Sequence, residues 1–210
     1  MKTQRLPSPS AAPSPRAQRV RGGASASQPS RLPPDSLAFS LLLAARVLAA
    51  VRVGRSLTQA MAPLASEPPS ARAEAQDAAY ATLRRYGCGE FLLRRLLAKA
   101  LPHPETEALL LAALYRLQSR PEAAYVVVDQ AVTAAGELAE GAFKGLVNAV
   151  LRNYLRQRED LDRAMLDDYE ARHQHPAWWL KRLRRGYPDC WQRIVAFANV
   201  WAPSPRDEIS

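Results

Sequence analysis

The sequence of 210 residues contains few of the side chains on which most enzymes depend. It has only two cysteines, Cys88 and Cys190, and three histidines, His103, His173 and His175. The cysteines lie far apart, with no partner at metal-ligand spacing, which argues against a zinc site and against a disulfide scaffold. His173 and His175 are two positions apart, so their rings would face different directions on a helix. We interpret both as residues of a loop or a helix entry.

The sequence also has no apolar run long enough to cross a bilayer. The longest run, Leu37 to Ala45, is followed directly by Arg46, whereas a membrane-spanning helix needs about 20 residues. The N-terminus lacks the compact apolar segment of a secretory signal. We therefore expect no contact with a membrane and a location in the reducing cytoplasm.

Acidic residues are missing from the first 34 positions, where six basic residues stand among many Pro, Ser, Ala and Gly. Residues 1–34 have too few large apolar groups to offset the entropy of ordering them, so we expect a disordered cationic arm. An organelle transit peptide and a misassigned start codon remain alternative interpretations. The whole chain has a formal net charge of +9, which favours a polyanionic partner, nucleic acid before an anionic membrane.

The rest of the chain is rich in Ala and Leu, and its apolar residues recur at helical spacing between Pro and Gly breaks. We expect an all-α bundle of about eight or nine helices over residues 35–203, with Gly87-Cys88-Gly89 breaking one helix from the next. Val126-Val127-Val128 alone resembles a strand, but its neighbours keep helical spacing. The residues expected in the core are Leu109, Leu110, Ala113, Leu114, Val127, Ala131, Phe143, Leu146, Val147, Val150, Leu151 and Tyr154.

The clearest candidate for function is a polar stripe on the helix expected within residues 141–159. Lys144, Asn148, Arg152 and Arg156 follow one another at steps of four, which drift by only about 40° each around a helix. The stripe holds cations and an amide but no carboxylate. It is either the solvated side of a core helix or a surface that binds an anion. Asn148 could instead face inward and bind a neighbouring helix end.

Two further basic groups lie near expected helix ends, at residues 84–85 and 181–185. Arginine forks onto phosphate oxygens, and asparagine can bind a base edge or a sugar. The helix dipole alone also favours basic residues at these positions. The candidate RNA-binding residues are therefore Arg84, Arg85, Lys144, Asn148, Arg152, Arg156, Lys181, Arg182, Arg184 and Arg185. We find no candidate catalytic or metal-binding residue, because the carboxylates of residues 159–170 alternate with arginines as on a solvated surface.

Three segments together resemble a known family. F-K-G-L-V-N-A-V-L-R-N-Y-L-R, H-P-A-W-W-L-K-R-L and G-Y-P-D-C-W-Q-R-I-V-A-F-A-N occur in this order, as in the N-terminal part of the ribosomal RNA small-subunit methyltransferase B family. The resemblance covers roughly Leu37 to Pro203. It implies a NusB-like all-α domain that binds RNA, in particular small-subunit ribosomal RNA.

In that family the domain precedes a catalytic domain that uses S-adenosylmethionine and two cysteines to methylate C5 of a cytosine. Here only Ser204 to Ser210 follow, with no glycine-rich cofactor loop and no proline-cysteine motif. We therefore expect a truncated C-terminal tail at 204–210, no cofactor in this chain and no methylation by it alone, with a separate catalytic chain as one potential partner. Two alternatives stay open: a NusB-like transcription antitermination factor, and a protein-docking domain that uses Trp178, Trp179 and Trp201.

Overall fold

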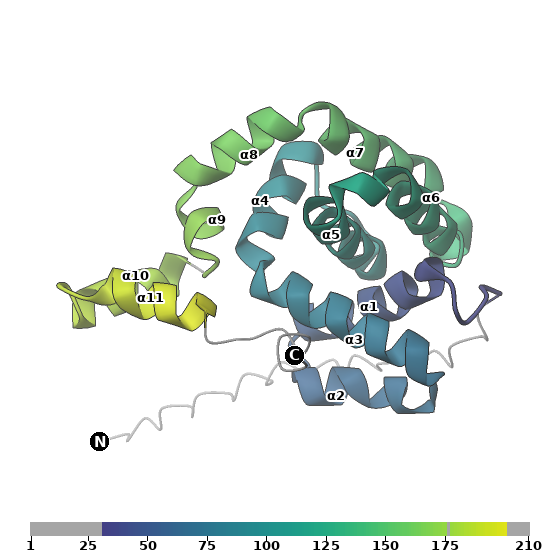
Figure 1. Cartoon of the computed structure of the whole chain (residues 1–210), viewed down its shortest axis with the longest axis horizontal. Helices are drawn as coiled ribbons and strands as arrows, with labels where there is room; N and C mark the ends of the chain where they lie inside the picture. The colour runs from purple at the N-terminus through teal and green to yellow at the C-terminus, as the bar shows by residue number, and fades with distance from the viewer. Residues whose placement is uncertain (1–30, 176, 201–210) are drawn as a thin grey trace, which may run out of the picture.

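Every regular element that the computed structural model describes is helical, over residues 31–175 and 177–200 (Figure 1). The described residues form α1 (Leu37–Arg52), α2 (Leu57–Met61), α3 (Pro69–Arg84), α4 (Tyr86–Leu96), α5 (Pro104–Ser119), α6 (Ala124–Ala135), α7 (Lys144–Arg156), α8 (Arg158–Asp167), α9 (Tyr169–His173), α10 (Ala177–Gly186) and α11 (Trp191–Val200). Short 3₁₀ turns lie at Ala62–Ser66, Pro121–Ala123 and Ala139–Gly141. The all-α prediction is confirmed, and Val126–Val128 belong to α6. The arm expected at 1–34 lies almost entirely outside the described residues.

Helix α5 runs through the middle of the bundle, with α1, α3, α4, α6 and α7 around it (Figure 1). Its residues from Ala108 to Leu114 are buried on every side of the helix, as expected for a helix with no solvated face. Helix α1 packs against α5 and is itself buried from Ala38 to Ala45. The predicted core residues are buried except Phe143 and Leu146, which are half-buried. Phe143 precedes the first turn of α7, so its ring stays at the edge of the core.

The break between α3 and α4 lies at Arg85 rather than at Gly87-Cys88-Gly89, which is part of α4. The prediction of a glycine break was wrong because the two glycines serve close packing instead. A Cβ at Gly87 would lie 2.5 Å from the carbonyl oxygen of Glu170, and a Cβ at Gly89 would lie 2.7 Å from Leu111 Cδ2. The glycines therefore let α4 approach α9 and α5 at close range.

Helices α10 and α11 project from one side of the bundle (Figure 1) and have a small core of their own, formed by Leu180, Trp191 and Val195. Trp191 also meets the ring of His173 edge-on, at 5.2 Å between centroids. Glu170 accepts a 2.7 Å hydrogen bond from the backbone N–H of Ala177 at the start of α10. These contacts attach the projecting helices to α9.

None of the helices in the described ranges combines the length and apolar character that crossing a membrane requires.

Candidate nucleic-acid interface

The polar stripe predicted from the sequence lies on α7. The apolar face of this helix is buried through Val147, Val150, Leu151 and Tyr154. The opposite face, which carries the stripe, therefore remains at the surface. The chain enters α7 through three consecutive residues with positive φ, namely Ala139, Glu140 and Gly141. Such backbone is unfavourable for residues with a Cβ, so the turn is held by its surroundings. The result is a helix whose polar face lies beside α6.

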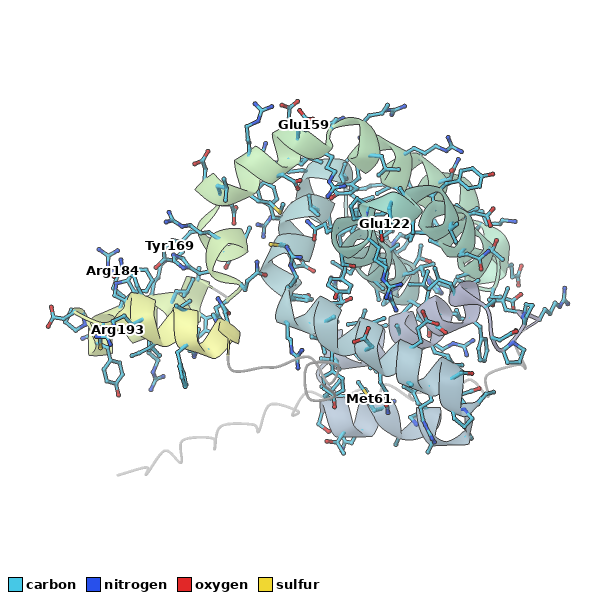
Figure 2. The ribbon with its side chains drawn as sticks, viewed as in Figure 1. Met61, Glu122, Glu159, Tyr169, Arg184 and Arg193 are labelled. Atoms are coloured by element: carbon cyan, nitrogen blue, oxygen red, sulfur yellow. The ribbon has the colours of Figure 1, made fainter. Side chains whose placement is uncertain are left out.

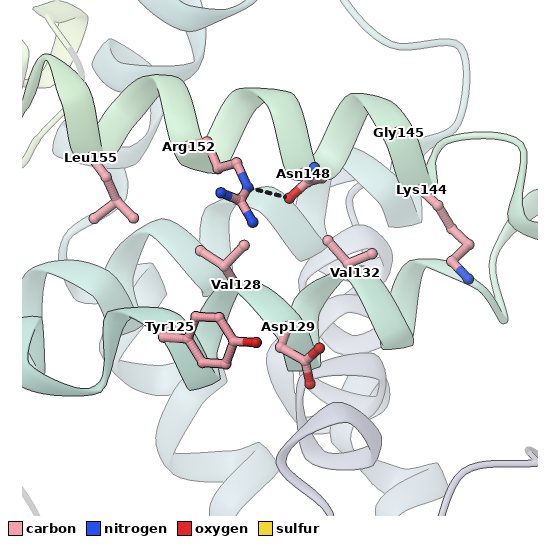
Figure 3. Close-up of a pocket in the computed structure, with 9 residues that line it drawn as sticks. All are labelled: Tyr125, Val128, Asp129, Val132, Lys144, Gly145, Asn148, Arg152 and Leu155. Carbon is pink, nitrogen blue, oxygen red and sulfur yellow. Dashed lines mark hydrogen bonds between the residues drawn. The ribbon is translucent and has the colours of Figure 1, made fainter.

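Three of the four stripe residues line a hollow of about 460 Å³ between α6 and α7 (Figure 3). One wall is α7, with Lys144, Asn148 and Arg152, and the other wall is α6 (Figure 3). The full lining is Tyr125, Val128, Asp129, Val132, Lys144, Gly145, Asn148, Arg152 and Leu155. Valine and leucine side chains thus lie between polar groups, in a hollow of the size that binds small molecules, about 300–1,000 Å³.

The amide of Asn148 orients the guanidinium of Arg152. Arg152 Nε donates a 2.9 Å hydrogen bond to Asn148 Oδ1 (Figure 3). Because guanidinium nitrogens only donate, the amide oxygen must face Arg152 and the Nδ2 donors must face elsewhere. Asn148 is half-buried and Arg152 is exposed. Within residues 31–175 and 177–200, no carboxylate is paired with Arg152, so its Nη donors remain available.

Lys144 is placed by its aliphatic stem. Its Cδ lies 3.7 Å and 3.5 Å from where a Cβ would stand at Gly136 and Gly141, so the stem passes over the glycine turn that leads into α7. The residue is exposed, and no ion pair holds its ammonium within the described ranges. Lys144 therefore presents a solvated charge at one end of the hollow.

The α6 wall adds two residues that the sequence reasoning missed, Tyr125 and Asp129. Tyr125 is 81% exposed, which is unusual for so large a ring. Asp129 Oδ2 accepts a 3.0 Å hydrogen bond from Gln130 Nε2, while Gln130 Oε1 accepts one from the N–H of Ala38. The signal in the sequence is their spacing of four residues on α6, which places both on one helix face.

Arg156, the fourth residue of the stripe, does not line the hollow. It is exposed, and its Nη2 donates a 3.3 Å hydrogen bond to Asn153 Oδ1. The slant of the stripe around the helix carries Arg156 beyond the hollow's rim, so the structure brings together Lys144, Asn148 and Arg152 but leaves Arg156 beside them.

The other predicted cations form separate groups. Arg84 and Arg85 are exposed at the junction of α3 and α4, where Arg84 lines a different hollow. Lys181, Arg182, Arg184 and Arg185 are all exposed on α10, at the opposite side of the view from α6 and α7 (Figures 1 and 2). The candidate residues thus lie on three surfaces rather than one.

A second hollow, of about 590 Å³, opens between α1, α4 and α9, but its charges are engaged with each other. Arg52 binds Glu90 at 2.8 Å and also binds Glu107, and Arg94 pairs with Glu170 at 3.5 Å. Burial and the neighbouring Glu90 raise the pKa of Tyr86 to about 12, so its phenol stays neutral. With cations already neutralised, this hollow is a poor site for an anion.

Four carboxylates of residues 159–170 form ion pairs. Asp162 pairs with Arg158 at 3.5 Å and Asp160 with Arg163 at 3.1 Å, while Asp168 and Glu170 both pair with Arg94, at 3.6 Å and 3.5 Å. Within the described residues, no group of His, Cys, Asp and Glu is arranged to hold a metal ion.

The tryptophans proposed for protein docking are placed differently from one another. Trp178 is 67% exposed on α10. Trp179 is half-buried, with its ring 4.4 Å from that of His175, and Trp201 lies outside the described residues. Trp178 is thus the one of the three whose ring the described structure offers to a partner.

Comparison with known proteins identifies the family of this chain. Residues 40–156 match the model of the NusB family. The chain is similar to "Ribosomal RNA small subunit methyltransferase B" of Vibrio cholerae, at 36% identity over 73% of the chain and 36% of the relative. It is also similar to the proteins of that name from Serratia proteamaculans (33% identity, 75% of the chain, 39% of the relative) and Escherichia coli (30%, 73% and 36%). The chain therefore spans less than two fifths of the length of these curated relatives.

Proposed function

Because the chain belongs to the NusB family, we propose that it is an RNA-binding module of the type found in small-subunit ribosomal RNA cytosine-C5 methyltransferases. The proposal rests on one observation above all: Lys144 and Arg152 lie on one wall of a hollow with no ion pair to a described carboxylate. In the second hollow, by contrast, Arg52 and Arg94 are each paired with a glutamate. Cations that are left unpaired beside an amide and an aromatic ring are suited to a polyanion that also carries bases.

In this role the positive groups bind phosphates and the remaining groups meet the bases. Lys144 acts as a point charge, and Arg152 is held by Asn148 so that its Nη donors keep a fixed direction. Arg156, one turn further along α7, extends the positive strip along the RNA backbone. Arg84, Arg85 and the cations of α10 are proposed as more distant phosphate contacts on a structured RNA.

The methyl-transfer step is not assigned to the described residues. When bound, S-adenosylmethionine supplies the methyl group in the family that the sequence resembles. A strand followed by a glycine-rich turn into a helix is the usual cradle for such a nucleotide-like cofactor, and residues 31–175 and 177–200 contain no strand. We therefore propose that a separate polypeptide or segment carries the catalytic cysteines, and that the described module positions the RNA.

The curated relatives favour this role over that of an antitermination factor. Their matches cover 73% to 75% of the chain, which is more than residues 40–156 of the NusB match. The similarity to proteins named as methyltransferases thus includes residues outside the NusB region. A module of this kind would act in the cytoplasm, where small ribosomal subunits are assembled.

The proposal is tested by equilibrium binding of the full chain to fragments of small-subunit and large-subunit ribosomal RNA. We expect a small-subunit fragment to bind more tightly, and we expect the triple variant K144A/R152A/R156A to lose most of that affinity. A triple variant that binds every RNA as tightly as the wild type would contradict the proposed interface. The variant R158A/R163A is the control, because it removes arginines of the neighbouring helix α8 that already form ion pairs with Asp162 and Asp160.

A further inference from the structure

The two walls of the hollow between α6 and α7 differ in their hydrogen-bonding character. In Figure 3, Val128 and Val132 point from α6 toward α7, whereas the Tyr125 ring and the Asp129 carboxylate lie along the outer edge of α6. The α7 wall carries donors: Lys144 Nζ, the Nδ2 of Asn148 and the Nη atoms of Arg152. The α6 wall carries the carboxylate of Asp129, which when ionised can only accept hydrogen bonds. Val128, Val132 and Leu155 lie among these polar groups. A ligand that fits both walls must offer acceptors to one side, donors to the other, and an apolar body in the middle.

The carboxylate of Asp129 has a hydrogen-bond partner in the neighbouring amide of Gln130. Gln130 Oε1 accepts from the N–H of Ala38 at 3.2 Å, so the Nε2 of the same amide must face Asp129, to whose Oδ2 it donates at 3.0 Å. This connection links Asp129 to the first turn of the buried helix α1. Oδ1 of Asp129 has no hydrogen-bond partner, and Asp129 has no ion-pair partner, in the described part of the chain. Oδ1 therefore remains open to a ligand.

A carboxylate at this position opposes the binding of phosphate alone. It repels a phosphate that approaches Lys144 and Arg152, so a site for the RNA backbone would bind more tightly without it. A nucleobase removes the conflict, since its amino and imino hydrogens can donate to the carboxylate. Tyr125 lies one helical turn from Asp129 on the same face of α6, and its ring, 81% exposed, is a surface on which a base can stack.

Among the four bases of RNA, guanine fits the two walls best. Its Watson–Crick edge presents two adjacent donors, N1–H and N2–H, which a carboxylate can accept together, and next to them the acceptor O6. The corresponding edges of cytosine, adenine and uracil each place an acceptor beside their donor, so a carboxylate would be repelled there. With N1–H and N2–H facing Asp129, O6 is available to the donors of the α7 wall.

We propose that this hollow holds one unstacked guanine of a single-stranded RNA segment, stacked on Tyr125 and recognised by Asp129, with Lys144 and Arg152 binding the flanking phosphates. The inference rests on the RNA-binding role proposed above and adds a base to it. In this arrangement, stacking on Tyr125 contributes affinity for any base, and Asp129 gives the preference for guanine.

The test uses the full chain and three fluorescein-labelled hexanucleotides: hexauridylate, the same probe with guanosine at the third position, and the same probe with inosine there. We expect the wild type to bind the guanosine probe about tenfold more tightly than hexauridylate, with inosine between them because it lacks the N2 amino group. D129A should bind hexauridylate at least as well as the wild type does, and should lose the preference for guanosine. Y125A should weaken binding of every probe by about tenfold, while Y125F should not.

Matched variants separate these effects from changes in charge or folding. E159A removes another exposed carboxylate, on α8 (Figure 2), and should leave the guanosine preference intact. Y187A removes an exposed tyrosine that lies outside the hollow and should bind like the wild type. Tyr125 and Asp129 are both exposed, so the thermal midpoints of Y125A and D129A should match that of the wild type.

The outcomes distinguish the two proposals. If no probe binds in a salt-dependent manner, both the RNA-binding role and the guanine site are wrong. If all three probes bind equally, and K144A/R152A weakens them all, the chain binds RNA backbone and the guanine site alone is overturned. An acidic peptide of equal charge that binds as tightly as the guanosine probe would also overturn it, by showing a general anion site.

Discussion

Removing the two cations of the hollow should change how RNA affinity depends on salt. Lys144 and Arg152 are exposed and have no ion pair to a described carboxylate, so each is free to displace a counterion from the RNA. Each phosphate contact to a single strand contributes about 0.7 to the slope of log affinity against log salt. The variant K144A/R152A should therefore flatten this slope by about 1.4.

The same slope sets the change in affinity across a salt titration. Between 50 mM and 200 mM salt, a slope difference of about 1.4 is a factor of about seven, so the defect of the variant should shrink about sevenfold over that range. The assay is fluorescence anisotropy of a labelled small-subunit ribosomal RNA fragment at four or more salt concentrations.

The control is R158A/R163A, which lowers the net charge by the same amount. Arg158 and Arg163 are already paired with Asp162 and Asp160, so their loss should change the slope much less. If both double variants flattened the slope equally, net charge rather than the α6–α7 face would govern binding, and the reasoning would be refuted.

Three further predictions concern stability. Leu114→Ala, at a fully buried position of α5, should lower the free energy of unfolding by about 2–5 kcal/mol. Leu166→Ala, at a site 67% exposed, should change it by less than about 0.5 kcal/mol; urea denaturation measures both, and equal effects would contradict the assigned core. Gly87→Ala should lower the free energy of unfolding by about 1–3 kcal/mol because its Cβ would meet the carbonyl of Glu170. Gly145→Ala, where a Cβ would have nothing within 4 Å, should leave stability unchanged or raise it. The reverse order of melting midpoints would show that α4 and α9 are not closely packed. Burial lowers the pKa of His173 from its ordinary value of 6.5, so the unfolded chain takes up this proton at a higher pH than the folded chain. The stabilising contribution of the neutral ring should be complete above about pH 7 and lost as the pH falls through the lowered pKa. Hydrogen exchange of α11 should then rise, and H173Q should reduce this pH dependence, with the remainder coming from His175, whose pKa burial also lowers.

The sequence predicts the fold well because the core follows helical periodicity. The apolar residues of α5 and α7 recur at the spacing of a helix face, so the pattern alone identifies most of the buried set, and Phe143 and Leu146 at the edge of the core are the exceptions. Gly87 and Gly89 were misinterpreted because glycine signals both a chain break and a close helix contact. Only the positions of Glu170 and Leu111, both distant in sequence, decide between these two meanings.

The candidate site could be predicted only in part, for a similar reason. The periodicity of one helix shows that Lys144, Asn148 and Arg152 share a face, but it does not show what lies opposite. Tyr125 and Asp129 belong to α6, and the bundle brings them to the hollow that the stripe also lines. The orientation of Asp129 depends further on Gln130 and Ala38, a contact between residues 92 positions apart that no local pattern contains.

The central claim, that RNA lies against α6 and α7, is tested most directly by ultraviolet cross-linking of the full chain to a 4-thiouridine-labelled small-subunit ribosomal RNA fragment, followed by mass spectrometry of the cross-linked peptides. We predict that the major cross-linked peptides contain residues of 125–155. Cross-links confined to α10 and α11, with none between residues 125 and 155, would contradict the account.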